Sequence, residues 1–304
     1  MMQPKEAIND FVIKFANVNG TGSASANGMF AKAIFRMGIP VSPRNIFPSN
    51  IQGLPTWYEV RISQDGYLGR RGGIDMMVSV NPQSFAKDVG EVEPGGYMLY
   101  DSTKPLDLRH VRRDIHYLGI PLTEMCLREY TDSRQRQLFK NVIYVGALSA
   151  LLNIDFAILK DLVSEQFKGK EKLITPNIHA LEMGHQCAST HFQCPLGIHL
   201  KAGEQTPKHI QEFDQILMDG NTATALGAVY AGATVAAWYP ITPSTSVIDA
   251  FEKYCRRLRI DPGTGKRTKP SSRRKTSSLQ WAWSLAPTGM AHARSRPPVA
   301  LACH

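Results

Sequence analysis

The sequence predicts an α/β fold built on a mostly parallel sheet. A strand-like segment at 11–17 (FVIKFAN) runs into a glycine-rich loop that contains Gly20, Gly22 and Gly28. Residues 25–37 follow this loop with apolar side chains at helical spacing. Short strand-like and helix-like segments then alternate along the chain, a pattern typical of a parallel sheet covered by helices.

The same periodicity assigns the remaining elements of a first domain. Short apolar and β-branched runs predict strands at 39–41, 56–62, 76–80 and 96–100. Apolar residues at helical spacing predict helices at 141–152 and 156–167. Residues 176–203 show no regular period, so we predict an irregular connection there.

A second α/β segment begins near Phe213. It is predicted to contain a helix at 222–231, a short strand at 233–239 and a helix at 244–258. Ser244 is the expected N-cap of the last helix, because its hydroxyl can accept a hydrogen bond from the first turn.

Positive charge is concentrated near the end of the sequence. The 304 residues include 35 Lys and Arg against 26 Asp and Glu, a net charge of +9. Eight basic residues and no acidic residue follow Asp261, so the other 27 basic residues nearly balance the 26 acidic ones. The chain up to Asp261 is therefore nearly neutral, which gives no support to nucleic-acid binding.

The apolar content suits a globular protein. No apolar run approaches the length needed to cross a bilayer, so no membrane association is expected. The first ten residues lack the apolar core of a secretory signal, and we expect a cytoplasmic protein. Five scattered cysteines argue against a disulfide framework.

The most informative segment combines GNTATALGA at 220–228 with YPITPST at 239–245. Small residues let the first helix pack closely, and two prolines restrict the turn between strand and helix. The N-terminus of a helix that starts after Ser244 favours an anionic group such as a carboxylate, and Thr242 offers a hydroxyl beside it. The alternative is a rigid, well-capped turn without a ligand.

This segment resembles the start of the pyrimidine-binding domain of the thiamine-diphosphate-dependent 2-oxoacid:ferredoxin oxidoreductases. Thr224 departs from the family pattern, which usually has another small or an acidic residue there. VNGTGSASANG at 18–28 and GYLGRRGGIDMMVSVNP at 66–82 are similar to the gamma domain of that family. The resemblance implies a Rossmann-like gamma domain at 1–204, followed by an incomplete pyrimidine-binding α/β domain at 205–267.

A gamma domain fused ahead of an alpha domain is the arrangement of the bacterial alpha subunit, which often acts on 2-oxoglutarate. The resemblance implies oxidative decarboxylation of a 2-oxoacid to an acyl-coenzyme A, with electrons passing to ferredoxin. Thiamine diphosphate would lie against Tyr239, Pro240, Ile241 and Thr242. Thr242, the implied catalytic residue, and Ser244 would bind the substrate.

Two cofactor motifs are missing from the sequence. It has no Gly-Asp-Gly motif with a suitably spaced Asn for magnesium and diphosphate, and no closely spaced cysteine set for an iron–sulfur cluster. We therefore expect a beta subunit to supply the magnesium and the cluster and to share the thiamine diphosphate.

Three further signals are weaker. The Gly20–Gly28 loop departs from Gly-x-Gly-x-x-Gly, which favours a structural turn over a nucleotide site. Residues 70–73 (RRGG) suit either a solvated turn or contact with an anion or a partner subunit. The His and Cys residues between His179 and His199 lack metal-ligand spacing, so no metal site is predicted. A non-catalytic assembly module and an unrelated dinucleotide-binding protein stay open as alternative functions.

Residues 268–304 have an unusual composition, rich in Ser, Arg and Pro with two Trp and no Glu. The resemblance calls for an aminopyrimidine-contacting Glu shortly after residue 267. Codons read from their third base permit Gln-Ala-Glu-Asp-Glu across 272–277 and Trp-Asn-Gly-Ala-Arg across 288–293. We therefore expect a disordered, out-of-frame tail on a truncated alpha subunit that is inactive as written.

Overall fold

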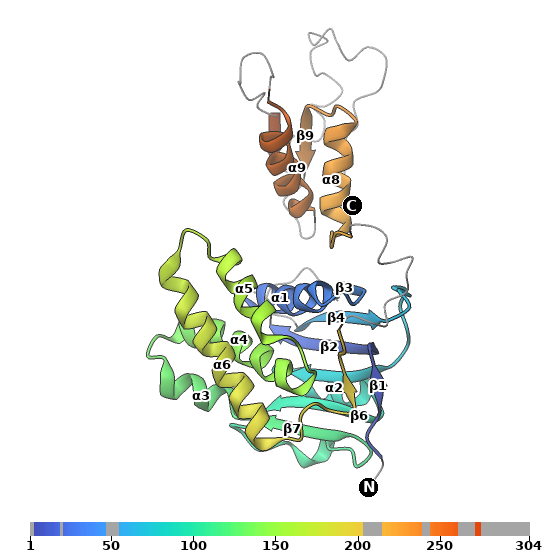
Figure 1. Cartoon of the computed structure of the whole chain (residues 1–304), viewed down its shortest axis with the longest axis vertical. Helices are drawn as coiled ribbons and strands as arrows, with labels where there is room; N and C mark the ends of the chain where they lie inside the picture. Colours follow the sequence, from blue (N-terminus) through green and yellow to red (C-terminus); the bar gives the residue numbers. More distant parts are fainter. Residues whose placement is uncertain are drawn as a thin grey trace. The chain divides into compact units, whose positions relative to one another are not determined.

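The computed structural model describes residues 3–18, 21–46, 55–202, 215–238, 244–260 and 271–274. The chain forms two units, Met1–Gln215 and Ile216–His304 (Figure 1). We predicted a division after residue 204. That position lies outside the described residues, and the structure divides the chain at Gln215.

Unit 1 is built on a six-stranded sheet with the order β3-β4-β2-β5-β6-β7. Its strands are β2 (Asp10–Val18), β3 (Val41–Ile46), β4 (Pro55–Ser63), β5 (Ile74–Ser79), β6 (Val92–Asp101) and β7 (His116–Ile120). Only β4 runs antiparallel to the others. The predicted α/β fold with a mostly parallel sheet is confirmed. A separate parallel pair joins β1 (Ala7–Ile8) to β8 (Ile198–His199).

Helices cover both faces of this sheet, but unequally (Figure 1). One face carries α1 (Ser23–Arg36), α3 (Leu122–Glu129), α4 (Ser133–Leu151), α5 (Phe156–Gln166) and α6 (Ile174–His191). The other face carries α2 (Phe85–Glu91). Two short 3₁₀ turns, Leu108–His110 and Glu171–Leu173, complete unit 1. Among the described helices, none has the length and hydropathy needed to cross a bilayer.

The side chains of strand β2 alternate between the two faces of the sheet. Phe11, Ile13 and Phe15 are fully buried in the large core under the helix layer. Val12 and Ala16, which point the other way, belong to the smaller core beside α2. The alternation follows from the two-residue period of a strand, and both faces are apolar because both are covered.

The prediction of an irregular connection at 176–203 is wrong, because α6 occupies this region up to His191. Its buried side consists largely of small or polar residues, among them Asn177, Ala180, Gly184 and Ala188. These side chains give little hydrophobic contrast between the two sides of the helix, so the periodicity of α6 is weak. Strand β7 and helices α2 and α3 are also absent from the predicted elements.

Two glycines let α4 and α6 cross at close range. A Cβ atom at Gly146 would overlap the carbonyl oxygen of Leu181 on α6. A Cβ atom at Gly184 would overlap the carbonyl oxygen of Ile143 on α4. Any larger residue at either position must therefore push the two helices apart.

Unit 2 contains α8 (Gly220–Tyr230), β9 (Val235–Trp238), α9 (Thr245–Leu258) and β10 (Ser271–Arg274). The predicted helices and strand lie within two residues of these bounds. Small side chains of α8 pack against Val247 and Phe251 of α9. Strand β10 pairs in parallel with β9, so the expected disorder does not apply to those four residues. The rest of 268–304 lies outside the described residues.

Candidate functional site

A crevice is expected at the carboxyl ends of β2 and β5. These strands are adjacent and parallel, and the helices that follow them, α1 and α2, lie on opposite faces of the sheet. In open α/β sheets, ligands bind outside the carboxyl ends of strands at such a switch point. This expected crevice, defined here by Asn17, Asn81 and the N-terminus of α1, is the candidate site of unit 1.

The glycine-rich loop brings the chain from β2 into α1. Gly22, the N-cap residue, has a left-handed backbone with φ of 81° and offers no capping side chain. The Asn141 side chain donates to the carbonyl oxygen of Thr21 (2.8 Å), and a Cβ atom at Gly22 would overlap Leu138. The turn thus packs against α4. The first turn of α1 also contains no acidic side chain that would repel an anion.

Two asparagines lie at the carboxyl ends of β2 and β5, and sequence reasoning missed both. Asn81 donates to the carbonyl oxygen of Asn17 (3.4 Å), and its own side-chain oxygen accepts from the Gln83 amide (3.0 Å). Asn17 is 3% exposed, yet its Oδ1 atom has no hydrogen-bond partner in the structure. A buried amide oxygen without a partner destabilises the fold unless a ligand satisfies it.

A buried carboxyl group fixes the end of β5 from the other face. Asp88 is fully buried and accepts hydrogen bonds of 2.8 Å from Trp57 Nε1, Ser79 Oγ and Ser84 Oγ. Burial raises the pKa of Asp88 despite these three donors. Because Ser79 is the last residue of β5, this network fixes the carboxyl end of that strand.

Asp101 forms a second polar cluster at the carboxyl end of β6. It accepts from Lys140 Nζ at 2.6 Å, from Thr103 Oγ1 at 2.7 Å and from Thr123 Oγ1. Burial acts to raise the pKa of Asp101, but the hydrogen bonds from Lys140 and Thr123 outweigh it and lower the pKa to about 2. The cluster is fully paired, so its role is to join β6 to α3 and α4.

Replacing Asp101 with Asn is expected to lower stability by about 1–2 kcal/mol at neutral pH, after allowance for solvent screening. The folded pKa lies below the unfolded value of about 3.9, so the contribution is complete above about pH 4 and lost as pH falls toward 2. Urea denaturation of the full chain across this range measures it. Asp107→Asn is the control, because its pair with Arg109 lies on the surface, and no measurable change is expected there. Equal pH profiles for wild type and Asp101→Asn would contradict the assignment.

The Arg70–Gly73 segment resolves into two roles. The Arg71 guanidinium and the Lys5 ammonium group both pair with Asp75, whose carboxylate is fully buried. Arg71 is therefore half-buried and held by this ion pair. Arg70 is exposed, and of the two arginines it is the one accessible to an anion or a partner.

The histidines and cysteines between His179 and His199 form local contacts, among them an exposed ion pair between His179 and Glu129. The Ser149 hydroxyl lies 2.7 Å from His185 Nδ1, but Ser149 is 1% exposed and no substrate reaches it. Burial raises the pKa of the Cys187 and Cys194 thiols, which disfavours the reactive thiolate. Among the described residues, no three His, Cys, Asp or Glu side chains are grouped to hold a metal ion.

The predicted site residues of unit 2 lie mostly outside the described residues. These are Tyr239, Pro240, Ile241 and Thr242. Ser244 is 8% exposed and directly precedes α9, as predicted, but its side chain makes no capping hydrogen bond to the helix.

A hydrogen bond joins the two halves of the unit 2 motif. Asn221 Nδ2, at the start of α8, donates to Ser246 Oγ (2.7 Å), at the start of α9. Asp219 caps α8 through the Thr222 amide (2.9 Å). The N-termini of both helices are therefore joined, and their dipoles favour an anion there, although the capping Asp219 carboxylate opposes it.

Comparison with known proteins decides the family. Residues 12–187 match the family model for pyruvate ferredoxin/flavodoxin oxidoreductase. The chain belongs to this family. The match covers the sheet and helices of unit 1 from β2 to α6, so the crevice lies inside the family domain.

Relatives extend the similarity into unit 2. Subunit alpha of 2-oxoacid:ferredoxin oxidoreductase 2 from Aeropyrum pernix is 24% identical over 282 residues, which covers 81% of this chain and 43% of the relative. The 2-oxoglutarate oxidoreductase subunit KorA of Mycobacterium tuberculosis is 22% identical, covering 82% of this chain and 42% of the relative. The chain thus spans less than half the length of these relatives.

A solved structure supports the same fold. The 2-oxoglutarate:ferredoxin oxidoreductase from Magnetococcus marinus, with 2-oxoglutarate, coenzyme A and succinyl-CoA bound, aligns with a TM-score of 0.71 at 23% identity. The alignment covers 89% of this chain and 44% of that one. At this identity the likeness shows the fold.

Proposed function

We propose that this chain is the alpha subunit, with an N-terminal gamma domain, of a 2-oxoacid:ferredoxin oxidoreductase. One observation carries the proposal: alpha subunits of such enzymes align over more than 80% of the chain, across both units. The preferred substrate is 2-oxoglutarate, supported by the name of one relative and by the ligands of the Magnetococcus structure. The products are an acyl-coenzyme A and reduced ferredoxin.

Thiamine diphosphate supplies the ylid and the electron sink for this chemistry. The chain itself orients the substrate. The Thr242 hydroxyl donates to the 2-oxo oxygen or the carboxylate, and Tyr239, Pro240 and Ile241 form the cofactor-facing turn. Ser244 and the meeting helix N-termini favour the substrate carboxylate at this place. A beta subunit brings magnesium and the iron–sulfur cluster.

We also propose that residues 268–304 are translated out of frame. The supporting observation is the absence of any acidic residue after Asp261, where an alpha subunit needs a cofactor-contacting Glu. Sequencing the coding DNA and its transcript tests this directly. An intact frame through the region in both would refute it.

The function is tested by producing the full chain with the beta subunit of its own organism. We expect the two chains to co-purify. Once the frame after residue 267 is restored, we expect reduction of a viologen dye that requires both 2-oxoglutarate and coenzyme A. NAD⁺ binding by the chain without dye reduction would favour the alternative of a dinucleotide-binding protein.

We further propose that the crevice of unit 1 binds coenzyme A. The diphosphate group suits the uncapped N-terminus of α1, and a donor on the ligand would satisfy Asn17 Oδ1.

Asn17→Leu is expected to weaken coenzyme A binding about ten-fold without loss of stability, because it removes a buried polar group that has no partner. Calorimetric titration and thermal denaturation of the full chain measure both effects. Asn45→Leu is the matched control, since Asn45 is exposed on β3 and should bind as wild type. Unchanged affinity of Asn17→Leu would rule out the crevice as the site.

A further inference from the structure

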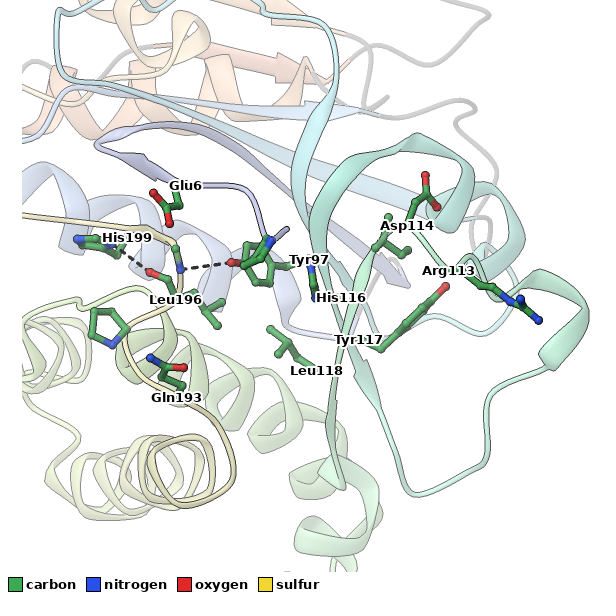
Figure 2. A pocket seen from close by; sticks show the side chains of 14 residues that line it. Glu6, Tyr97, Arg113, Asp114, His116, Tyr117, Leu118, Gln193, Leu196 and His199 are labelled. Atoms are coloured by element: carbon green, nitrogen blue, oxygen red, sulfur yellow. Dashed lines mark hydrogen bonds between the residues drawn. The ribbon is translucent and has the colours of Figure 1, made fainter. Parts of the chain in front are cut away.

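A cavity of about 630 Å³ lies at the amino end of β7 (Figure 2). Consecutive residues 113–118 form one wall, and residues between 193 and 199 form another. The Tyr97 hydroxyl joins the walls by accepting from the Gly197 amide (3.3 Å). Because the lining follows β7 residue by residue, the cavity runs along this strand.

Strand β7 is the last strand of its sheet, so one of its edges has no strand beside it among the described residues. The Gly95 amide donates to the carbonyl oxygen of Asp114 (2.6 Å), and the Ser102 amide to that of Ile120 (2.9 Å). Backbone groups of successive residues point to alternate sides of a strand. Even-numbered residues therefore bond to β6, and the amides of Tyr117 and Gly119 point outward.

The two edges of the sheet differ in their protection. The opposite edge strand, β3, contains Pro43 and Arg44, residue types that block pairing with another chain. Strand β7 has the sequence HYLGI, with no proline, lysine or arginine. An unprotected edge beside a cavity is the arrangement that accepts an added strand.

Three polar side chains around the cavity could form further hydrogen bonds or ion pairs. His116 Nε2 is buried without a hydrogen-bond partner. Glu6 and Arg113 are exposed, form no ion pair with any described residue, and lie on opposite sides of Tyr97 in Figure 2. Leu118 and Leu196 provide an apolar surface between them.

We propose that the outer edge of β7 binds an extended segment of a partner protein as an added strand. An apolar side chain of that segment packs on Leu118 and Leu196. A basic residue of the segment pairs with Glu6, and an acidic residue pairs with Arg113. The added backbone bonds to the outward groups of Tyr117 and Gly119, and this site is independent of the oxidoreductase function.

The test uses the full chain and a fluorescein-labelled peptide, Thr-Lys-Thr-Val-Thr-Glu-Thr, with binding followed by anisotropy. At saturation we expect amide exchange of Tyr117 and Gly119 to slow about ten-fold, because both gain hydrogen bonds. Exchange of His116 and Leu118, already bonded to β6, should change little. No binding, or binding that leaves Tyr117 and Gly119 unchanged, would overturn the proposal.

Charge variants give an independent measurement. Peptides with two Lys or two Glu in place of the Lys–Glu pair should bind about three-fold more weakly. Arg113→Glu, an exposed replacement, should reverse the order and prefer the peptide with two Lys. Tyr117→Pro removes an outward amide without removing a bond to β6, so loss of binding is expected. It also removes the ring that packs against Tyr100 and the hydroxyl that accepts from the Arg112 amide, so the denaturation midpoint is expected to fall. If Arg113→Glu leaves the ranking of the peptide affinities unchanged, the proposal is contradicted. This outcome can be measured even if Tyr117→Pro fails to fold.

Discussion

Gly184→Ala is expected to lower the free energy of unfolding of unit 1 by about 2–3 kcal/mol. The new methyl group would overlap the carbonyl oxygen of Ile143 and approach the Ala147 amide at the crossing of α4 and α6. Alanine gains about 1 kcal/mol over glycine as a helix former, but the overlap with backbone atoms is larger. Urea denaturation of the full chain, followed by circular dichroism, measures the change.

Gly28→Ala is the matched control for this prediction. Gly28 also lies inside a helix, α1, but a Cβ atom there meets nothing within 4 Å. This variant should gain up to about 1 kcal/mol. Equal effects of the two replacements would mean that the close crossing of α4 and α6 is not required.

Thr242→Val is expected to reduce kcat of the assembled, frame-restored enzyme by about 10²–10³-fold. The replacement keeps the shape of the side chain and removes only the hydroxyl proposed to donate to the substrate. Dye reduction with the beta subunit, at varied 2-oxoglutarate concentration, separates kcat from KM. Thr242→Ser should recover most of the rate because it restores the donor.

The control for Thr242 is Thr224→Ala. The Thr224 hydroxyl, on the exposed side of α8, donates to the carbonyl oxygen of Gly220 (2.8 Å). Thr224→Ala removes a threonine hydroxyl from α8 and should leave the rate of dye reduction unchanged. A wild-type rate for Thr242→Val would show that another group binds the substrate oxygen.

Hydrophobic periodicity predicted the elements whose two sides differ strongly. Strand β2 alternates large apolar residues, and α9 carries Val247 and Phe251 on one side and charged residues on the other. Both were placed correctly. Helix α6 and strand β7 were missed, because Gly184 and Ala188 bury a small-residue face and His116–Ile120 is too short and mixed for a clear period.

The candidate site of unit 1 could be predicted only in part. The loop after β2 was visible as a glycine cluster. Sequence patterns did not indicate Asn17 and Asn81, because these residues, 64 positions apart, come together only when β2 pairs with β5. The Asn221–Ser246 bond likewise depends on the packing of α8 against α9, which no local pattern encodes.

The pairing of β1 with β8 has a consequence for how this unit can be reused in evolution. Ala7 and Ile198 are register partners, so the first and last strands of unit 1 lie side by side. A domain whose ends are neighbours can be joined to another gene at one end, or separated from it, without disturbing its sheet. The 2-oxoglutarate synthase subunit KorC of Archaeoglobus fulgidus matches 57% of this chain over 88% of its own length. The relatives of this chain thus include one that it nearly spans and alpha subunits of which it spans less than half.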